Sequence, residues 1–275
     1  MYRYLRAIGY TGLHSRAEAM NYLSHFVTRD SGRLMNHECG LDMGVMIYLN
    51  PEFDQYTMEY FFPYARGDRA MRIHDLAVEE RSEGPGYFGV IEDERNLLLL
   101  SFLCTNPEML TAGDYPECSV YLSGFSLSGK ILLPAKEPVH EKISKTDNAT
   151  RNRHFQHSDI DDVHSKDSLI EYINREEELY HLLRERMKTE SLYRIIETTL
   201  MPYGVECDTY HVLGNILAVD EIINRDTGEI VLKLDLETYG YKFPVYINSR
   251  DILGEPLPGR RFKGNVRLQG VVETN

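Results

Sequence analysis

The most regular alternation of hydrophobic and polar positions lies in the last third of the chain. Residues 230–236 place apolar side chains at every second position, with Val231 as the one exception. Residues 241–247 repeat this alternation after a Tyr239-Gly240 turn, and residues 262–272 repeat it again with two glycines in register. A period of two is typical of half-buried β-strands. The pattern therefore predicts three strands that share one buried face.

Two further features extend this β-rich segment. A long strand is predicted over 211–223, and residues 224–228 are rich in turn formers, which favours a hairpin into the next strand. Several short, alternating strands within about seventy residues indicate a small closed or partly open barrel over 205–275. The oligonucleotide/oligosaccharide-binding (OB) barrel is the first interpretation, and an SH3-like barrel is the alternative.

The first half of the chain also reads as mainly β. Turn signals made of glycine, proline and asparagine separate its strand-like runs. These runs are 43–49, 55–62, 73–80, 87–91, 97–104, 119–127 and 130–133. Four consecutive leucines at 97–100 predict a central strand buried on both faces.

The first thirty residues carry the helix signals of this half. Residues 2–8 suggest a short strand, and a polar loop is expected over 29–40. Between them, Ser15 and Glu18 have the spacing of a capping box, which predicts a helix that runs to about Thr28. One helix packed on a mostly antiparallel sheet gives an α+β domain over 1–135.

The middle of the chain has a different composition. Residues 134–167 are polar and almost without aliphatic side chains, which is typical of a linker or a surface excursion. A helical period returns over 168–200, before Pro202 and Gly204, and predicts a pair of helices. The predicted fold class is thus α+β in three parts: the domain over 1–135, a polar and helical linker over 136–204, and the barrel over 205–275.

Composition narrows the classes of function. The chain has 275 residues and a formal net charge of −13, so as a whole it repels phosphate. The N-terminus lacks the pattern of a signal peptide, no apolar run reaches the length of a spanning helix, and the four cysteines form no CxxC pair. These features predict a cytoplasmic protein that does not act at a membrane. Nucleic acid is possible as a partner but disfavoured by the acidity.

Three local patterns carry candidate chemistry, and each has a simpler interpretation. Residues 84–89 spell G-x-G-x-x-G, but a strand rather than a helix is expected after them, which favours a turn over a phosphate loop. Cys39 has His37 and Glu38 as neighbours, yet neighbours in sequence need not face one another. A cluster of possible metal ligands contains His154, His157, His164, Asp159, Asp161 and Asp162. Its spacing matches no standard site, so it is interpreted as a solvated linker, and neither a metal nor a cofactor is expected.

The barrel offers the remaining candidate surface. If the apolar residues of its strands face inwards, basic and aromatic residues between them face outwards, as in barrels that bind single strands. The candidate ligand-binding residues are Lys242, Tyr246, Arg260, Arg261, Lys263 and Arg267. Acidic residues such as Asp235 and Glu237 are expected to face outwards on a neighbouring strand. These acids oppose a phosphate backbone.

Six short motifs are spread along the chain: Leu5-Arg6-Ala7-Ile8-Gly9, residues 129–134, Met201-Pro202-Tyr203-Gly204, Leu213-Gly214, residues 252–256 and residues 259–264. They resemble those of an uncharacterised bacterial protein family of unknown function. The resemblance covers nearly the whole chain and implies no catalytic residue. It supports the division into domains and leaves the function open.

Three hypotheses follow from the sequence. The first is a cytosolic, non-enzymatic interaction or scaffold protein that binds a protein partner or a second copy of itself. The second is a nucleic-acid accessory protein that uses the basic surface of the barrel. The third is a small-molecule enzyme with a polar pocket between the domains.

Overall fold

The computed structural model of this chain divides into two compact units, residues 1–133 together with 198–275, and residues 134–197. The described residues are mostly β-strand, with short helices beside the strands. No helix among them is long and apolar enough to cross a membrane. The structure describes residues 2–28, 32–52, 55–82, 84–93, 98–134 and 196–274.

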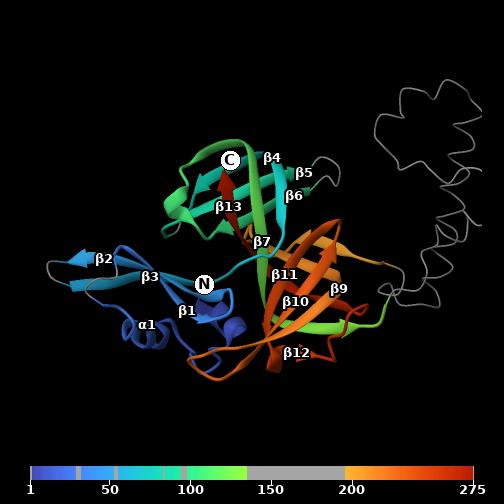
Figure 1. Ribbon diagram of the computed structural model, residues 1–275, viewed down its shortest axis with the longest axis horizontal. Helices are drawn as coiled ribbons and strands as arrows, with labels where there is room; N and C mark the ends of the chain where they lie inside the picture. Colours follow the sequence, from blue (N-terminus) through green and yellow to red (C-terminus); the bar gives the residue numbers. More distant parts are fainter. Residues whose placement is uncertain are drawn as a thin grey trace, which may run out of the picture. The chain divides into compact units, whose positions relative to one another are not determined.

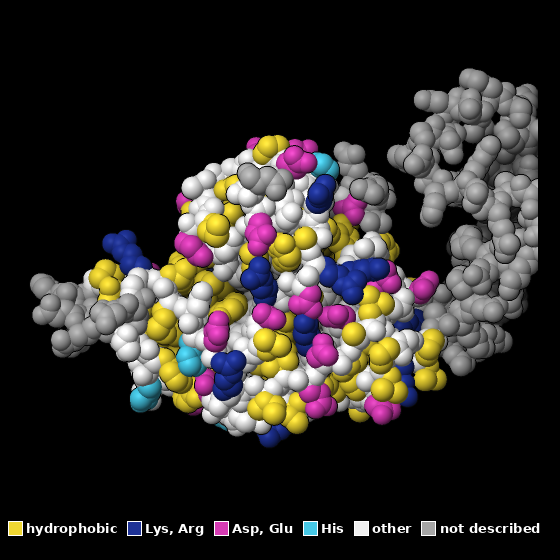
Figure 2. Space-filling view, in the orientation of Figure 1, with side chains coloured by type: hydrophobic (Ala, Val, Ile, Leu, Met, Phe, Trp, Pro, Cys, Tyr) yellow, Lys and Arg dark blue, Asp and Glu magenta, His cyan; other side chains and the backbone are white. Residues whose placement is uncertain are grey.

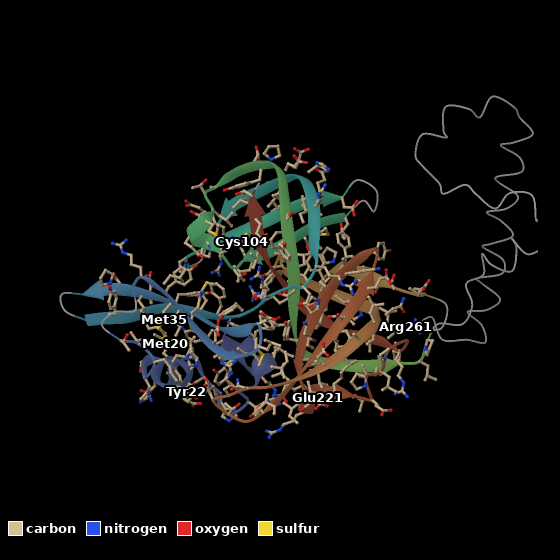
Figure 3. The ribbon with its side chains drawn as sticks, in the orientation of Figure 1. Met20, Tyr22, Met35, Cys104, Glu221 and Arg261 are labelled. Carbon is tan, nitrogen blue, oxygen red and sulfur yellow. The ribbon has the colours of Figure 1, made fainter. Side chains whose placement is uncertain are left out.

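The N-terminal residues form a 3-10 helix, an α-helix and an antiparallel sheet of three strands in the order β1-β2-β3. Their bounds are η1 Tyr2–Ile8, α1 Arg16–Ser24, β1 Leu34–Gly40, β2 Met43–Glu52 and β3 Gln55–Ala65. Ser15 caps α1 by accepting a hydrogen bond from the backbone N–H of Glu18 at 3.1 Å. Met20 of α1 and Met35 of β1 lie together between the helix and the sheet (Figure 3).

All other strands belong to one ten-stranded sheet, which is built from two successive groups. The first group contains β4 Ala70–Glu80, β5 Tyr87–Asp93, β6 Leu98–Cys104, η2 Pro107–Met109 and β7 Gly113–Leu132. The second group contains β8 Thr199–Pro202, β9 Thr209–Ile223, β10 Ile230–Thr238, β11 Tyr241–Asn248, η4 Ser249–Asp251, β12 Ile252–Leu253 and β13 Arg261–Thr274. Figure 1 shows β7 passing from one group of strands into the other.

Backbone hydrogen bonds close this sheet into two rings of five strands. Ring 1 runs β4-β5-β6-β13-β7 and returns to β4. Ring 2 runs β9-β10-β11-β7-β13 and returns to β9. In each ring one pair is parallel, β6 with β13 or β11 with β7, and the other pairs are antiparallel. The two rings therefore share β7 and β13.

The rings repeat one another in the order of their elements. In each ring three antiparallel strands are followed by a 3-10 helix and then by one of the two shared strands, with the two-residue strand β12 inserted before β13 in ring 2. The residue before each 3-10 helix is asparagine, Asn106 in ring 1 and Asn248 in ring 2. The loop between the first two strands has six residues in both rings, 81–86 and 224–229. The chain thus contains an internal repeat in which each half donates its long strand to both rings.

The shared strands are long enough to serve both rings. β7 has 20 residues and β13 has 14, whereas an average strand has about five or six. At the centre of their pairing, Ser123 lies opposite Gln269. Both side chains donate a hydrogen bond to the carbonyl oxygen of Ala65, at 2.8 and 3.2 Å. The end of β3 is thereby fixed over the seam between the rings.

Two main hydrophobic clusters hold the described residues together. The larger one fills the rings, and it includes Phe262, Val266, Leu268 and Val272, as the alternation in β13 predicts. The second cluster joins η1 and α1 to the three-stranded sheet and to the outside of ring 2. Val231, which breaks the alternation in β10, is fully buried in this second cluster. Its apolar side chain is explained by this packing.

Several local predictions need correction. Residues 2–8 form a 3-10 helix instead of a strand, and α1 ends at Ser24 instead of Thr28. Residues 34–40 form β1, although a loop was expected there. Leu99 in β6 is 57% exposed, so this central strand is not buried on both faces. The strand β1 is explained by its pairing with β2, which the hydrophobic pattern of residues 34–40 alone does not report.

Only some of the elements predicted for the middle of the chain can be compared with the structure. The polar linker and nearly all of the predicted helical pair lie outside the described residues. Residues 199–202, expected near the end of the second helix, form the strand β8 on the edge of β9. The segments predicted as an N-terminal domain and a C-terminal barrel lie in one compact unit, since the strands β7 and β13 are common to both rings.

Candidate functional site

The predicted basic surface is not assembled in the structure. Lys242 and Arg260 lie at the surface in ion pairs with Glu237 and Glu255, at 3.1 and 3.3 Å. Lys263 is half-buried on β13. On the face shown in Figure 2, Lys and Arg side chains lie among Asp and Glu side chains. A ligand-binding role for the six predicted residues stays a prediction.

Three of these six residues do not face outwards, which corrects the expectation from the alternation. Tyr246, Arg261 and Arg267 are 0%, 2% and 8% exposed. Tyr246 Oη donates to the carbonyl oxygen of Arg66, and Arg261 Nε donates to that of Leu133. Tyr246 on β11 belongs to the hydrophobic cluster that joins η1 and α1 to the outside of ring 2, and Arg267 lies over the ring of Tyr4 in η1.

Arg267 forms the most buried ion pair of the described residues. Its Nε donates to Asp208 Oδ2 at 2.7 Å, and its Nη1 lies 3.1 Å from Glu206. Burial raises the pKa of Asp208, and the charge of Arg267 partly offsets this effect. The guanidinium also lies over the ring of Tyr4, 5.4 Å from its centre. A small cavity beside it measures about 10 Å³, room for about one water molecule.

The structure also describes Cys39 and His37, which the sequence suggested as a reactive pair. Cys39 and His37 do not pair, since the Cys39 thiol faces the carbonyl oxygen of Met43 and His37 Nε2 bonds Asp226. Burial raises the pKa of Cys39 to about 12, which keeps the thiol neutral. The histidine cluster at 154–164 lies outside the described residues. Within the described ranges, no group of three or more His, Cys, Asp or Glu side chains is placed to hold a metal ion.

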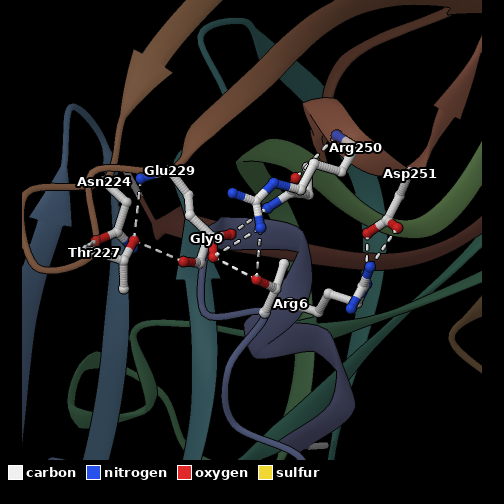
Figure 4. Close-up of polar contacts among 9 residues, drawn as sticks. Arg6, Gly9, Asn224, Thr227, Glu229, Arg250 and Asp251 are labelled. Carbon is white, nitrogen blue, oxygen red and sulfur yellow. Dashed lines mark hydrogen bonds and ion pairs between the residues drawn. The ribbon is translucent and has the colours of Figure 1, made fainter.

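The loop 224–229 of ring 2 is filled by the chain's own N-terminal segment. Asn224 Nδ2 donates to the carbonyl oxygen of Ile8, and Thr227 Oγ1 donates to that of Gly9, both at 2.7 Å (Figure 4). Gly9 has a φ of +98°, and a Cβ there would lie 2.8 Å from Asn224 Cβ. The close approach of the segment to the loop therefore requires glycine.

Further polar contacts close the same region. Asp226 Oδ2 accepts hydrogen bonds from Tyr10 Oη at 2.5 Å and from His37 Nε2 at 2.7 Å. Burial, the nearby Cys39 and the bond to Asp226 together raise the pKa of Tyr10. Arg6 forms a bidentate pair with Asp251 at 2.6 and 2.7 Å (Figure 4). The side chains of Asn224, Asp226, Thr227 and Glu229 thus have partners within the protein.

The corresponding loop of ring 1 opens instead onto a cleft. The two loops are closed by the same backbone hydrogen bond, from Arg81 N to Gly86 O at 3.1 Å and from Asn224 N to Glu229 O at 2.9 Å. Arg81 therefore takes the place of Asn224. The cleft has a volume of about 470 Å³, within the range of ligand sites. It is lined by Arg33, Leu34, Tyr48, Glu80, Arg81, Gly84, Pro85, Gly86, Tyr87, Pro107 and Glu108.

Arg81 lines this cleft and is held in place by contacts with three other residues. Its Nη1 donates to Pro85 O at 2.9 Å and its Nη2 to Tyr60 Oη at 3.0 Å. The guanidinium lies over the rings of Tyr60 and Phe88, 5.1 and 5.6 Å from their centres. Such cation–π contacts stabilise a cation that has left water. Among the residues that the structure describes, no carboxylate pairs with Arg81.

Two hydrogen-bond donors of the cleft have no acceptor. Tyr48 Oη and Arg81 Nε are buried, and neither atom finds a partner among the described residues. Burial raises the pKa of Tyr48 to about 12, so its hydroxyl keeps the proton. An unpaired buried donor costs about 1–3 kcal/mol, which makes such groups rare unless they serve a purpose. This cleft is the candidate functional site.

Sequence reasoning found part of this site and missed the rest. It identified residues 84–86 as a turn into a strand, which is confirmed by β5 starting at Tyr87. It did not bring Tyr48 and Arg81 together, because Tyr48 lies on β2 of the three-stranded sheet and Arg81 lies in the loop after β4 of the other sheet. The sequence does contain two loops of equal length, 81–86 and 224–229. Their equivalence can be recognised only once the two rings are known.

The fold defines a mostly β protein in which two repeated rings share their long strands. The chain matches the family model described as "Domain of unknown function, E. rectale Gene description (DUF3881)" over residues 5–270 and belongs to that family. This match confirms the resemblance to an uncharacterised bacterial family. No curated protein and no solved structure matches the chain.

Proposed function

We propose that this protein is a non-enzymatic interaction module of the cytoplasm, which receives a segment of a protein partner in the cleft beside loop 81–86. The observation that carries the proposal is the contrast between two equivalent loops. The ring 2 loop receives the segment 8–10 of the chain itself, whereas the ring 1 loop has an open cleft and two donors without acceptors.

The shape and lining of the cleft support a peptide segment as its occupant. Tyrosine and proline side chains supply contact area at little cost in conformational entropy, as in many protein interfaces. Tyr48, Tyr87, Pro85 and Pro107 line the cleft together with Leu34. A second copy of this chain is one source of such a segment, and an unrelated partner is another.

We further propose that each ring is a small barrel of the OB type, and that the polar linker and helical pair are a separate part that ends before Thr198, where the compact unit of the rings resumes. The closure of five strands with one parallel pair in each ring supports the barrel assignment. An OB-like barrel does not by itself define a ligand. Binding of nucleic acid is less favoured, because Arg261 and Arg267 are buried. All four cysteines are free thiols, which supports a reducing compartment.

Site-specific photo-crosslinking in cells tests the proposed function. A photoreactive phenylalanine analogue replaces Tyr87 in the cleft in one variant and Tyr239, at the β10–β11 turn, in a control variant. We expect a distinct crosslinked protein only from position 87, and we expect Leu34→Asp in the same chain to abolish it. The crosslinked protein, once purified, should bind the wild-type chain. Equal crosslinking from both positions, or none from position 87, would contradict the proposal.

A further inference from the structure

The unpaired donors of the cleft indicate which kind of atom its ligand must present. Tyr48 Oη and Arg81 Nε both carry a proton and both lack an acceptor. Tyr48 lies on β2, and Arg81 follows β4 directly, so both groups are positioned by strands. An occupant with oxygen acceptors would satisfy both donors and recover the cost of leaving them buried. The ligand therefore presents at least two oxygen acceptors.

The charges around the cleft favour a neutral acceptor. Two cations, Arg33 and Arg81, line it together with two carboxylates, Glu80 and Glu108. The lining residues that the structure describes thus carry no net formal charge. The whole chain has a net charge of −13, which opposes the approach of an anionic ligand. Peptide carbonyl oxygens are neutral acceptors, and they occur at every residue of a polypeptide.

The equivalent loop of ring 2 shows such an acceptor in place. Two side chains of that loop, Asn224 and Thr227, donate to the consecutive carbonyl oxygens of Ile8 and Gly9. Arg225 N donates to a third carbonyl oxygen, that of Cys39, at 2.7 Å. The position of this loop in the ring therefore suits the binding of polypeptide backbone through carbonyl oxygens.

We propose that the cleft binds an extended, proline-containing peptide segment, whose main-chain carbonyl oxygens accept hydrogen bonds from Tyr48 Oη and Arg81 Nε. This inference rests on the proposed function and names its ligand. A polyproline II segment has no internal hydrogen bonds, so its carbonyl oxygens are available. Its rings pack against aromatic side chains in grooves, and the lining residues Tyr48 and Tyr87 provide such a surface.

Binding requires a small movement of residues 84–86, because both donor atoms are buried beneath the cleft surface. A Cβ on Gly86 would lie 3.4 Å from Tyr48 Oη, which places this turn directly against the hydroxyl. The turn is held by the bonds from Arg81 N to Gly86 O and from Arg81 Nη1 to Pro85 O. Tyr48 Oη makes no hydrogen bond to this turn. The turn can therefore move away from the hydroxyl without losing a hydrogen bond to Tyr48.

Peptide binding to the full chain tests this inference. The probe is a fluorescein-labelled oligoproline blocked at its far end, so that it offers carbonyl oxygens but no carboxylate. Tyr48→Phe removes one donor and should weaken binding by roughly twofold to tenfold, the value of one hydrogen bond. The melting temperature should stay the same or rise, because the lost hydroxyl has no partner in the protein. Tyr64→Phe, on the neighbouring strand β3, is the matched control and should leave the affinity unchanged.

Two further peptides separate carbonyl recognition from other modes. An oligoalanine of the same length and block should bind more weakly than the oligoproline, and an acidic oligoalanine should bind no better than the neutral one. The inference is overturned if the acidic peptide binds best, or if Tyr48→Phe and Tyr64→Phe bind the oligoproline equally well. It is also overturned if crosslinking from position 87 identifies a partner that oligoproline fails to displace. That last result would leave the proposed function standing.

Discussion

The loops 81–86 and 224–229 occupy equivalent positions in two repeated rings, yet one is open and the other is filled. Both have six residues and both are closed by a backbone hydrogen bond between their first and last residues. The loop 224–229 binds two carbonyl oxygens of the N-terminal segment, whereas the loop 81–86 leaves Arg81 Nε without an acceptor. The position within the fold thus does not decide whether such a loop bonds another segment of the chain or borders an open cleft.

Side-chain type explains the difference between the two loops. Asn224 is short and polar, so it bonds backbone groups at close range: it donates to Ile8 O in the N-terminal segment and accepts from Asp226 N–H inside the loop. The carboxylate of Asp226 accepts from the side chains of Tyr10 and His37. In the other loop, Gly84, Pro85 and Gly86 carry no side-chain donors, and Arg81 is long enough to cross beneath the turn. The short polar side chains of loop 224–229 favour close contact with the N-terminal segment. The composition of loop 81–86 leaves a cleft beside it.

The largest loss of stability is expected from a substitution that creates a cavity inside ring 1. Phe102 is fully buried and packs over Gly89 and Gly270, so Phe102→Ala should lower the free energy of unfolding by about 3–5 kcal/mol. Because the rings share β7 and β13, amides of β10 in ring 2 should lose protection from hydrogen exchange as well. Unchanged protection of β10 would show that the rings unfold separately. Leu99→Ala, on the exposed side of the same strand, is the control.

Substitutions in the loop 224–229 should cause the next largest loss of stability. Asn224 is fully buried and bonds Ile8 O as well as the N–H groups of Asp226 and Thr227. Asn224→Ala should therefore lower the free energy of unfolding by about 2–4 kcal/mol in urea denaturation. Arg225→Ala changes only an exposed side chain in the same loop, and an effect of similar size there would contradict this account.

Alkaline pH should destabilise both halves through their buried thiols. Burial raises the pKa of Cys39 and of Cys104 to about 12. In the unfolded chain these thiols ionise near their usual pKa, about 8.5. Stability should thus be unaffected by them below about pH 8.5 and fall by up to about 1.4 kcal/mol per pH unit per thiol as pH rises towards 12. The slope of unfolding free energy against pH should decrease in Cys39→Ala and in Cys104→Ala, and an unchanged slope would argue against thiol burial.

The smallest effect is expected at the surface of ring 2. Lys242 and Arg260 lie in exposed ion pairs, and such pairs contribute about 0–1 kcal/mol. In the double variant Lys242→Glu, Arg260→Glu, each substitution should change the free energy of unfolding by less than about 1 kcal/mol. Arg267→Met, which leaves Asp208 unpaired and buried, should cost clearly more in the same denaturation experiment. Equal costs would contradict the buried placement of Arg267.

Local sequence patterns predicted the strands better than their assembly. The alternation in residues 230–236, 241–247 and 262–272 identified β10, β11 and β13, and Ser15 marked the start of α1. The alternation did not show that β7, far earlier in the chain, completes ring 2 between β11 and β13. Pairing between distant strands depends on the whole chain, and the period of one strand carries no information about its neighbours.

The candidate site was less predictable than the fold for a related reason. The outward residues of β13 were assigned to solvent because an alternating strand usually has one wet face. In the structure that face is covered, so Arg261 and Arg267 are buried. The cleft depends on Tyr48, Arg81 and Tyr87 meeting from separate elements. No short motif links these residues, so only the three-dimensional arrangement reveals them.

Hydrogen exchange of the two equivalent loops is the most direct test of the central contrast. The amides of Asp226 and Thr227 donate to Asn224 Oδ1, so they should exchange slowly in the free protein. The amides of Gly84 and Gly86 should exchange quickly, and they should become protected when the oligoproline probe is added. Equal protection of both loops in the free protein, with no change on adding the probe, would contradict the assignment of one loop as structural and the other as a binding site.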